Sequence, residues 1–340
     1  MSFFLNLSAP FIIAEMSGNH NQSIDRAFEI IDAASEAGAD AIKIQTYTAD
    51  TITLKNVFKI TEPSSPWYGR DLHDLYHEAH TPWDWHEAIF AHARMRGLIC
   101  FSSPFDETAV SFLESLNNPI YKIASFEINH IPLLKCVAQT GKPVIMSTGA
   151  STLSEIEEAV RTLRDNGCKQ LVLLKCTSTY PATPEDSNIL TIPHLATLFS
   201  CEVGLSDHTL GIGVSIGAVA LGAVVIEKHF CLDRSQGGVD SSFSLEPAEF
   251  KSLVIESKQA YLARGSVSYG LSKNEKRVDA GKRSIYSSED IKEGELFSEK
   301  NIKIIRPGDG LHPRHKEEIL GKKASKDLKK GTPLSWMDVK

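Results

Sequence analysis

Two histidines stand just after two apolar runs that are close together in the sequence. His208 follows the run Val203–Leu205 by two polar residues, and His229 closes the sequence Val224–His229. The small apolar residues between them, Gly211–Leu221, predict a helix, so the stretch indicates a strand, a helix and a second strand. In such a unit the strands are parallel and their carboxyl ends meet at one edge. If the strands are neighbours, the two histidines face one pocket and can bind one metal ion; the alternative is two unrelated histidines in polar loops.

Polar residues follow the other strand-like runs in the same way. A single lysine or glutamate at a strand end is usually solvated or ion-paired and has no further role. This explanation is less convincing when polar residues follow every predicted strand. Lysines supply point charges and hydroxyl-rich turns supply donors, which together indicate a site for a phosphorylated anion beside a metal. Glutamates there can transfer protons if burial raises their pKa. The residues at these ends are Glu15; Lys43 and Gln45; Ser102–Asp106; Lys122, Ser125 and Glu127; Ser147–Gly149; Lys175, Thr177, Ser178 and Tyr180; Ser206–His208; and Glu227–His229.

Strands and helices must alternate along the chain to bring these ends together. Eight strand–helix repeats favour a closed parallel (β/α)8 TIM barrel, with ligands at the carboxyl ends of its strands. The predicted strands are Phe11–Ala14, Ala41–Ile44, Leu98–Phe101, Ile120–Ile123, Val144–Met146, Leu171–Leu174, Val203–Leu205 and Val224–Ile226. The predicted helices are Ile24–Ala37, Trp83–Arg96, Thr108–Leu116, Leu133–Thr140, Leu153–Asn166, Ile189–Phe199, Gly213–Leu221 and Pro247–Leu262.

An open, doubly wound sheet is the competing fold. It is disfavoured because no glycine-rich phosphate fingerprint follows the first strand. Two long connections, Thr46–Pro82 and Thr177–Ser187, interrupt the alternation after strands. Long loops at the carboxyl face of a barrel are usually functional or form a lid.

The pattern changes near the end of the last predicted helix. We assign residues 1–264 to the barrel, residues 265–281 to a linker rich in Gly, Ser and charge, and residues 282–340 to a small β-rich domain. The phrases DIKEGELF and DLKKGTPL resemble one another, as in a two-fold module. About 60 residues make a small core, so we expect this domain to dock onto another surface.

Composition and charge restrict the partners. The 340 residues carry a net charge of −7, which gives no reason to expect nucleic acid or an anionic membrane as partner. The N-terminal sequence MSFFLNLSAPFIIAE lacks a basic region and a cleavage site, so it indicates a strand rather than a signal peptide. The six cysteines form no CxxC pair and are expected to be reduced. The expected compartment is the cytoplasm.

Three functions remain open on the residues alone. The first is a synthase or lyase that joins a phosphorylated small molecule to a carbonyl compound at a metal. The second is a metal-dependent phosphatase or isomerase. The third is a carbohydrate-binding protein that uses the C-terminal domain, for which the lysines and glutamates at the strand ends would be unnecessary.

Eight ordered motifs resemble the N-acetylneuraminate synthase family. They are FIIAEMSGNHNQ, IKIQTY, FSSPFDETAVSFLE, YKIASFE, GKPVIMSTG, CTSTYPA, GLSDHTLG and EKHF. KRSIYSS and IRPGDGL are similar to the SAF, or antifreeze-like, domain that ends such chains. The opening motif and the SLEP run are most similar to the pseudaminic acid synthase branch. The resemblance implies a transferase that condenses phosphoenolpyruvate with an N-acylated amino sugar and water, giving a nine-carbon 2-keto acid and phosphate.

The resemblance also implies residue roles. His208 and His229 match ligands of a divalent ion, either Mn²⁺, Mg²⁺ or Co²⁺. The positions expected to act in catalysis are Glu15, Glu127, Tyr180 and Asp240; which glutamate is the base stays open. The positions expected to bind phosphoenolpyruvate are Lys43, Ser103, Lys122, Ser125, Ser147 and Ser206.

Two further positions bear on the sugar. Ser178 stands where sialic acid synthases carry Asn, which favours a 2,4-diacetamido-2,4,6-trideoxy sugar of altro configuration. N-acetylmannosamine, or the manno isomer used in legionaminic acid synthesis, is the alternative. Arg306, in IRPGDGL, is expected to reach the sugar in the barrel of a partner subunit, which implies a domain-swapped homodimer.

Overall fold

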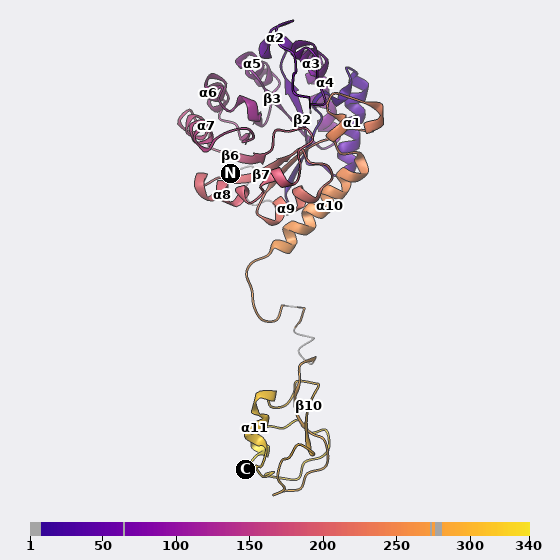
Figure 1. Ribbon diagram of the computed structural model, residues 1–340, viewed down its shortest axis with the longest axis vertical. Coiled ribbons are helices and arrows are strands. Elements are labelled where there is room, and N and C mark those ends of the chain that lie inside the picture. Colours follow the sequence, from indigo (N-terminus) through magenta and orange to yellow (C-terminus); the bar gives the residue numbers. More distant parts are fainter. Residues whose placement is uncertain (1–7, 64, 273, 276–280) are drawn as a thin grey trace. The chain divides into compact units, whose positions relative to one another are not determined.

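The computed structural model describes residues 8–63, 65–272, 274–275 and 281–340. The chain divides into two compact units, Met1–Gly265 and Ser266–Lys340, which are described separately (Figure 1). Residues 273 and 276–280 of the predicted linker, and residues 1–7 before the first predicted strand, lie outside the described residues.

The first unit is a closed barrel of eight parallel strands, so the predicted fold is confirmed. Each strand pairs with the next in sequence, and β1 pairs with β8 to close the barrel. The helices surround it (Figure 1). The strands are β1 (Phe11–Glu15), β2 (Ala41–Thr46), β3 (Ile99–Pro104), β4 (Tyr121–Ile123), β5 (Val144–Ser147), β6 (Leu171–Cys176), β7 (Glu202–Asp207) and β8 (Val225–His229). The helices are α1 (Ile24–Ala37), α2 (Ala49–Ile52), α3 (Leu72–Ala79), α4 (His86–Met95), α5 (Glu107–Ser115), α6 (Ile131–Gln139), α7 (Leu153–Asp165), α8 (Thr191–Phe199), α9 (Gly213–Ala220) and α10 (Pro247–Arg264).

Strand residues alternate between two apolar cores. Ile13 belongs to a cluster inside the barrel, whereas Ile12 and Ala14 belong to the larger cluster between strands and helices. The sequences of most strands contain a continuous apolar run because side chains on both faces of the strand are buried. Complete burial of one such side chain contributes about 1.5–3 kcal/mol relative to exposure.

The strands extend further at their carboxyl ends than predicted. β7 includes Ser206 and Asp207, and β8 includes Glu227, Lys228 and His229, because the interstrand ladder continues through these polar residues. Gly204 makes the β7–β8 contact possible: a Cβ there would lie 2.2 Å from the carbonyl oxygen of Val225.

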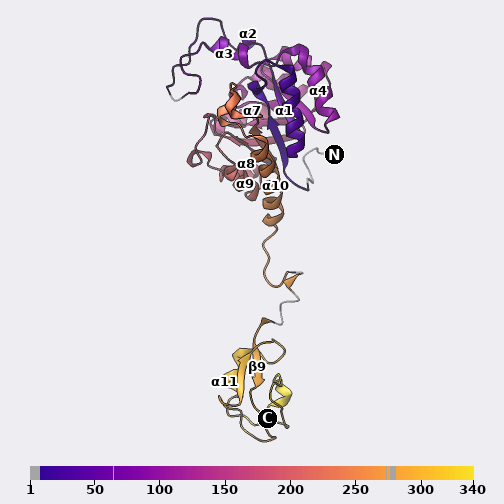
Figure 2. The ribbon, with the colours of Figure 1, turned by 90° about the vertical axis from the view of Figure 1, so that its right-hand side faces the viewer.

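The long connection after β2 contains the short helix α2 and the helix α3. Asp71 caps α3 by accepting hydrogen bonds from the backbone N–H groups of His73 and Asp74. The described residues between α2 and α3, 53–63 and 65–71, project from the barrel (Figure 2).

The C-terminal unit has its own core. β9 (Ser284–Ser287) pairs antiparallel with β10 (Ile302–Ile305), and the short helix α11 (Lys316–Ile319) follows. The two similar phrases meet at Ile291 and Leu328, whose backbones exchange two hydrogen bonds of 2.8 Å each. Asp290 accepts from the backbone N–H of Lys330, and Asp327 accepts in the same way from Glu293. The repeat in the sequence is therefore a local two-fold structure.

Two general features complete the fold. In the part of the chain that the structure describes, no helix combines the length and apolarity needed to cross a bilayer. All six cysteines carry free thiols.

Candidate functional site

The carboxyl ends of β1 and β2 contribute a buried ion pair. Glu15 and Lys43 are register partners on these strands, and Lys43 Nζ lies 2.7 Å from Glu15 Oε2. Burial raises the pKa of Glu15, and Lys43 only partly offsets this effect. Burial alone would lower the pKa of Lys43, but the carboxylates of Glu15 and Glu227 hold it above its ordinary value. Lys43 is therefore a fixed positive charge at the barrel mouth.

Glu227 lies at the centre of the buried charges. Its Oε1 atom lies 3.8 Å from Lys43 Nζ and 3.6 Å from Lys122 Nζ, and it accepts a 3.1 Å hydrogen bond from Ser206 Oγ. Burial opposes ionisation, but the two lysines outweigh it and keep the pKa of Glu227 below its usual value. The pKa values of Glu15 and Glu227 are thus shifted in opposite directions, an arrangement typical of proton-transfer sites.

Buried hydroxyls complete the surroundings of the lysines. Ser103 accepts a 3.4 Å hydrogen bond from Lys43 Nζ. Ser147 is buried, and its Oγ has no hydrogen-bond partner among the described residues. Ser125 accepts from the backbone N–H of Gly149 at 3.1 Å. Two lysines and a hydroxyl without a partner can bind an anion with several oxygen atoms.

His208 and His229 lie side by side, as their positions after neighbouring strands predict. Their ring centroids are 5.3 Å apart. His208 Nδ1 lies 2.9 Å from the carbonyl oxygen of Thr177, which assigns a proton to Nδ1 and makes Nε2 the nitrogen that would face a metal ion. Burial and the neighbouring His208 lower the pKa of His229, so its imidazole is neutral.

The histidine pair fits a divalent ion. With metal–nitrogen distances of about 2.1 Å, two imidazoles sharing an ion have ring centroids roughly 4.5–5.5 Å apart. Nδ1 of His229 is buried without a hydrogen-bond partner among the described residues, and it lies 3.8 Å from Asp240 Oδ2. Within the described ranges, no group of three or more His, Cys, Asp or Glu side chains has the geometry of a metal site. The two imidazoles would therefore need water or substrate to complete the coordination.

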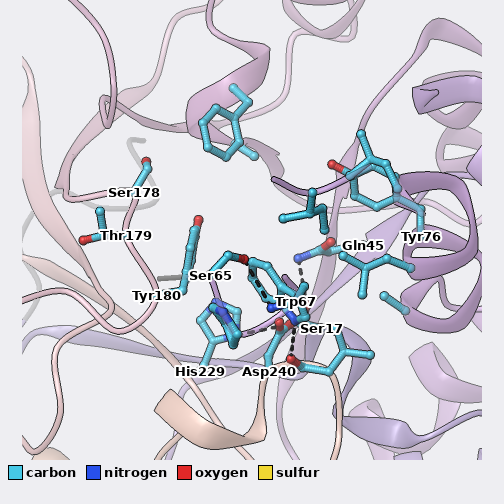
Figure 3. Close-up of a pocket in the computed structure, with 18 of the residues that line it drawn as sticks. Ser17, Gln45, Ser65, Trp67, Tyr76, Ser178, Thr179, Tyr180, His229 and Asp240 are labelled. Carbon is cyan, nitrogen blue, oxygen red and sulfur yellow. Dashed lines mark hydrogen bonds and ion pairs between the residues drawn. The ribbon is translucent and has the colours of Figure 1, made fainter. Parts of the chain in front are cut away.

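A cavity of about 560 Å³ opens beside the histidine pair. Figure 3 shows Ser17, His229 and Asp240 at its base, Gln45 and Tyr76 on one side, and Ser178, Thr179 and Tyr180 on the other. The ring of Tyr180 lies 4.5 Å from that of His208. Gly149 permits the close approach of the Ser178 side chain, because a Cβ at this position would lie 2.2 Å from Ser178 Oγ.

Two carboxyl groups in the cavity have raised pKa values. Glu127 ends a short 3₁₀ turn after β4, and burial raises its pKa to about 7 against the attraction of Lys122. Its Oε2 has no hydrogen-bond partner within the described part of the chain. Burial also raises the pKa of Asp240, although the Ser17 hydroxyl and the Gly18 N–H partly offset this effect. Glu127 can therefore accept or hold a proton near neutral pH.

The structure brings most of the predicted site residues together in one region. Arg306 is the exception: it lies exposed in the C-terminal unit, and its proposed place in a partner's site stays a prediction.

The predicted site residues did not include four that the structure places there. The sequence predicts Glu227 only as a strand-end residue. It shares the inward face of β8 with His229, two positions later, so the alternation of side chains along the strand is a signal that marks it. Gln45 donates to both Glu15 Oε1 and Ser17 Oγ. Ser17 adopts a positive φ of 46°, which is unusual for serine and is not predicted by its sequence context. Trp67 lies in a connection without hydrophobic periodicity, so no sequence pattern indicates that it lines the site.

The chain is similar to known proteins over nearly its full length. Residues 30–269 match the model of the NeuB family, and residues 282–340 match the SAF domain, as the C-terminal motifs predicted. Pseudaminic acid synthase of Campylobacter jejuni is 47% identical over 331 residues, covering 96% of each chain. Pseudaminic acid synthase of Helicobacter pylori is 44% identical, covering 98% of each chain. The solved structure of N-acetylneuraminic acid synthetase from Leptospira borgpetersenii, in complex with citrate, is 31% identical with a TM-score of 0.72; the match covers 79% of this chain and 90% of that one.

Proposed function

Because the chain belongs to the NeuB family, we propose that it is a pseudaminic acid synthase, a transferase that condenses phosphoenolpyruvate with an N-acylated amino sugar. The acceptor is 2,4-diacetamido-2,4,6-trideoxy-altropyranose, and the products are pseudaminic acid and phosphate. The observation that carries this proposal is the convergence of Lys43 and Lys122 beside two histidines in one cavity. A carbohydrate-binding module has no need for such a set of buried charges.

The lysines and hydroxyls bind phosphoenolpyruvate in this proposal. Lys43 and Lys122 attract its phosphate and carboxylate, and Ser103, Ser147 and Ser206 supply hydroxyl donors. The methylene carbon of phosphoenolpyruvate then attacks the aldehyde carbon of the open-chain sugar. Positive charge develops on the carbon that bears the phosphate, and the ionised carboxylate of Glu227 stabilises it.

The remaining steps need a base for water. Water adds to the cationic carbon, and Glu127 accepts its proton. The tetrahedral intermediate then expels phosphate by cleavage of the carbon–oxygen bond, which leaves the 2-keto acid. Glu127 is better suited than Glu15 to this role, because Glu15 is held in an ion pair with Lys43 whereas Glu127 faces the cavity.

We infer that His208 and His229 hold one divalent ion, with Tyr180 and Asp240 beside it. When bound, this ion polarises the sugar aldehyde as a Lewis acid. The choice between Mn²⁺, Mg²⁺ and Co²⁺ stays open.

The sugar-dependent release of phosphate tests the function. Wild-type protein, phosphoenolpyruvate and the diacetamido sugar should give one phosphate per keto acid, and omission of the sugar should abolish release. A chelator should stop the reaction, and added Mn²⁺ should restore it. Efficient use of N-acetylmannosamine with none of the diacetamido sugar would assign the chain to sialic acid synthesis. Phosphate release without any sugar would favour a phosphatase.

A further inference from the structure

One wall of the cavity is apolar, although the expected acceptor is a sugar. Helix α3 places Leu72, Leu75, Tyr76 and Ala79 along one face, at the i, i+3, i+4 and i+7 spacing of an amphipathic helix, and all four line the cavity. Its residues Asp74, His77 and Glu78 are exposed. The apolar face of α3 therefore lines a ligand cavity instead of packing only against a core.

Other elements extend this surface. Ile60 from the same connection, Phe105 after β3 and Phe126 after β4 also line the cavity. Phe126 is 61% exposed, so most of its ring is accessible to a ligand. We call Ile60, Leu72, Leu75, Phe105 and Phe126 the apolar wall.

The wall is held in place by contacts at both ends of α3. The Leu72 N–H donates to the carbonyl of Phe58 at 2.9 Å, and His73 Nε2 lies 3.0 Å from Asp50 Oδ1. At the other end, Gln22 Nε2 donates to the carbonyls of Glu78 and His80, each at 2.8 Å. A wall anchored in this way can discriminate between ligands by shape and polarity.

The cavity also has a polar base beside the histidine pair. Ser17, His229 and Asp240 form its base (Figure 3). The reacting aldehyde must lie there, beside the histidines, so the opposite end of the sugar extends toward the wall. The five side chains of the apolar wall offer a hydroxyl group no hydrogen-bond partner, whereas they would bury a methyl group favourably.

We propose that the apolar wall is the specificity site for a methyl group at the end of the sugar farthest from the aldehyde, and so selects 6-deoxy over 6-hydroxy acceptors. This deepens the proposed function and rests on it for the identity of the reaction. An apolar pocket distinguishes such pairs by roughly 10–200-fold.

Binding of unreactive sugars tests the wall without requiring turnover. Open-chain alditols of the 2,4-diacetamido sugar and of its 6-hydroxy analogue lack the aldehyde, and calorimetry gives their Kd values. Wild-type protein should bind the 6-deoxy alditol roughly tenfold or more tightly. Leu72→Asn, which keeps the size but adds polarity, should remove most of this preference.

Two variants serve as controls. Leu72→Met keeps the apolar character and should retain the preference. Leu54→Asn makes the same change as Leu72→Asn at an exposed position, 63% accessible and outside the cavity lining, and should bind as wild type does. The KM for phosphoenolpyruvate should be unchanged in all three variants.

Equal binding of both alditols by wild-type protein would overturn the proposal. So would an equal loss for both alditols in Leu72→Asn, or an unchanged preference in that variant. Failure of the proposed function is distinguishable: the preference in binding would persist, while wild-type protein would turn over neither diacetamido aldose.

Discussion

The carboxyl group of Glu127 combines burial with a position in the cavity. Its pKa is raised to about 7, so the folded protein keeps this proton between about pH 4.5 and 7, where the unfolded chain has already released it. Stability contributed by the protonated group is therefore lost as the pH rises through this range. The unpaired carboxylate that results is reactive and also unfavourable for folding.

We predict that Glu127→Gln lowers activity and raises stability. Loss of the base should reduce kcat/KM by about 10²–10⁴-fold and abolish the acidic limb of the pH profile near pH 7. The free energy of unfolding at pH 8 should rise by roughly 3 kcal/mol, and this gain should vanish below about pH 4.5. Denaturant unfolding at several pH values measures it, with the exposed Glu158→Gln as control. Retained activity with an unshifted pH profile would exclude Glu127 as the base.

The histidine pair gives a second prediction at the residue scale. His208→Ala and His229→Ala should each weaken Mn²⁺ binding by at least about 100-fold while the circular dichroism spectrum stays unchanged. His194→Ala changes an exposed histidine on α8 and should bind Mn²⁺ as wild type does. Mn²⁺ binding is followed by electron paramagnetic resonance in chelator-treated buffer. Wild-type affinity in either active-site variant would disprove the assignment.

Among the elements, β7 and β8 carry the two histidines and are joined by a buried ion pair. Asp207 and Lys228 are register partners, and Lys228 Nζ lies 2.8 Å from Asp207 Oδ2. Both side chains are almost inaccessible, and Ser215 also donates to Asp207 Oδ2. Since His208 and His229 directly follow Asp207 and Lys228 in the chain, this ion pair fixes the strand register that sets the positions of the two histidines.

We predict that Lys228→Met destabilises the barrel by about 3–5 kcal/mol, because it leaves the Asp207 carboxylate buried and unpaired. The double variant Asp207→Leu/Lys228→Met removes both charges and should recover much of this loss. Thermal and denaturant unfolding measure both variants. Equal destabilisation of the single and double variants would show that the charge pair is not the cause.

Periodicity predicts elements well but predicts their three-dimensional neighbours poorly. The barrel could be predicted because eight apolar runs alternate with helical patterns, and each run's polar end marks the carboxyl face. Glu227 was harder to assign, because its role depends on Lys43 and Lys122 from other strands. Trp67 could not be predicted, because its ring meets Tyr180 through a tertiary contact of 5.7 Å between distant segments.

At the scale of the whole molecule, the C-terminal unit bears on the site through Arg306. This unit contains its own apolar core, so it does not need another surface to fold around, and its docking stays a prediction. Arg306 is exposed there, at the end of β10. In a domain-swapped dimer, its guanidinium would bind the sugar of the partner subunit as a planar donor.

We predict that Arg306→Ala loses activity mainly through the sugar, with phosphoenolpyruvate binding unchanged. Mixing it with inactive His208→Ala should restore part of the activity, because a heterodimer contains one intact shared site. Subunit exchange is shown separately with differently tagged chains. Proven exchange without any recovery would place Arg306 in its own subunit's site or outside any site.

Cleavage of the carbon–oxygen bond is the central claim, and labelled phosphoenolpyruvate tests it most directly. The substrate carries ¹⁸O in the oxygen that bridges its second carbon and the phosphorus, and the released phosphate is analysed by mass spectrometry. Carbon–oxygen cleavage predicts that the phosphate retains the label in every sugar-dependent turnover. Unlabelled phosphate would mean attack at phosphorus, which would contradict the proposed synthase reaction.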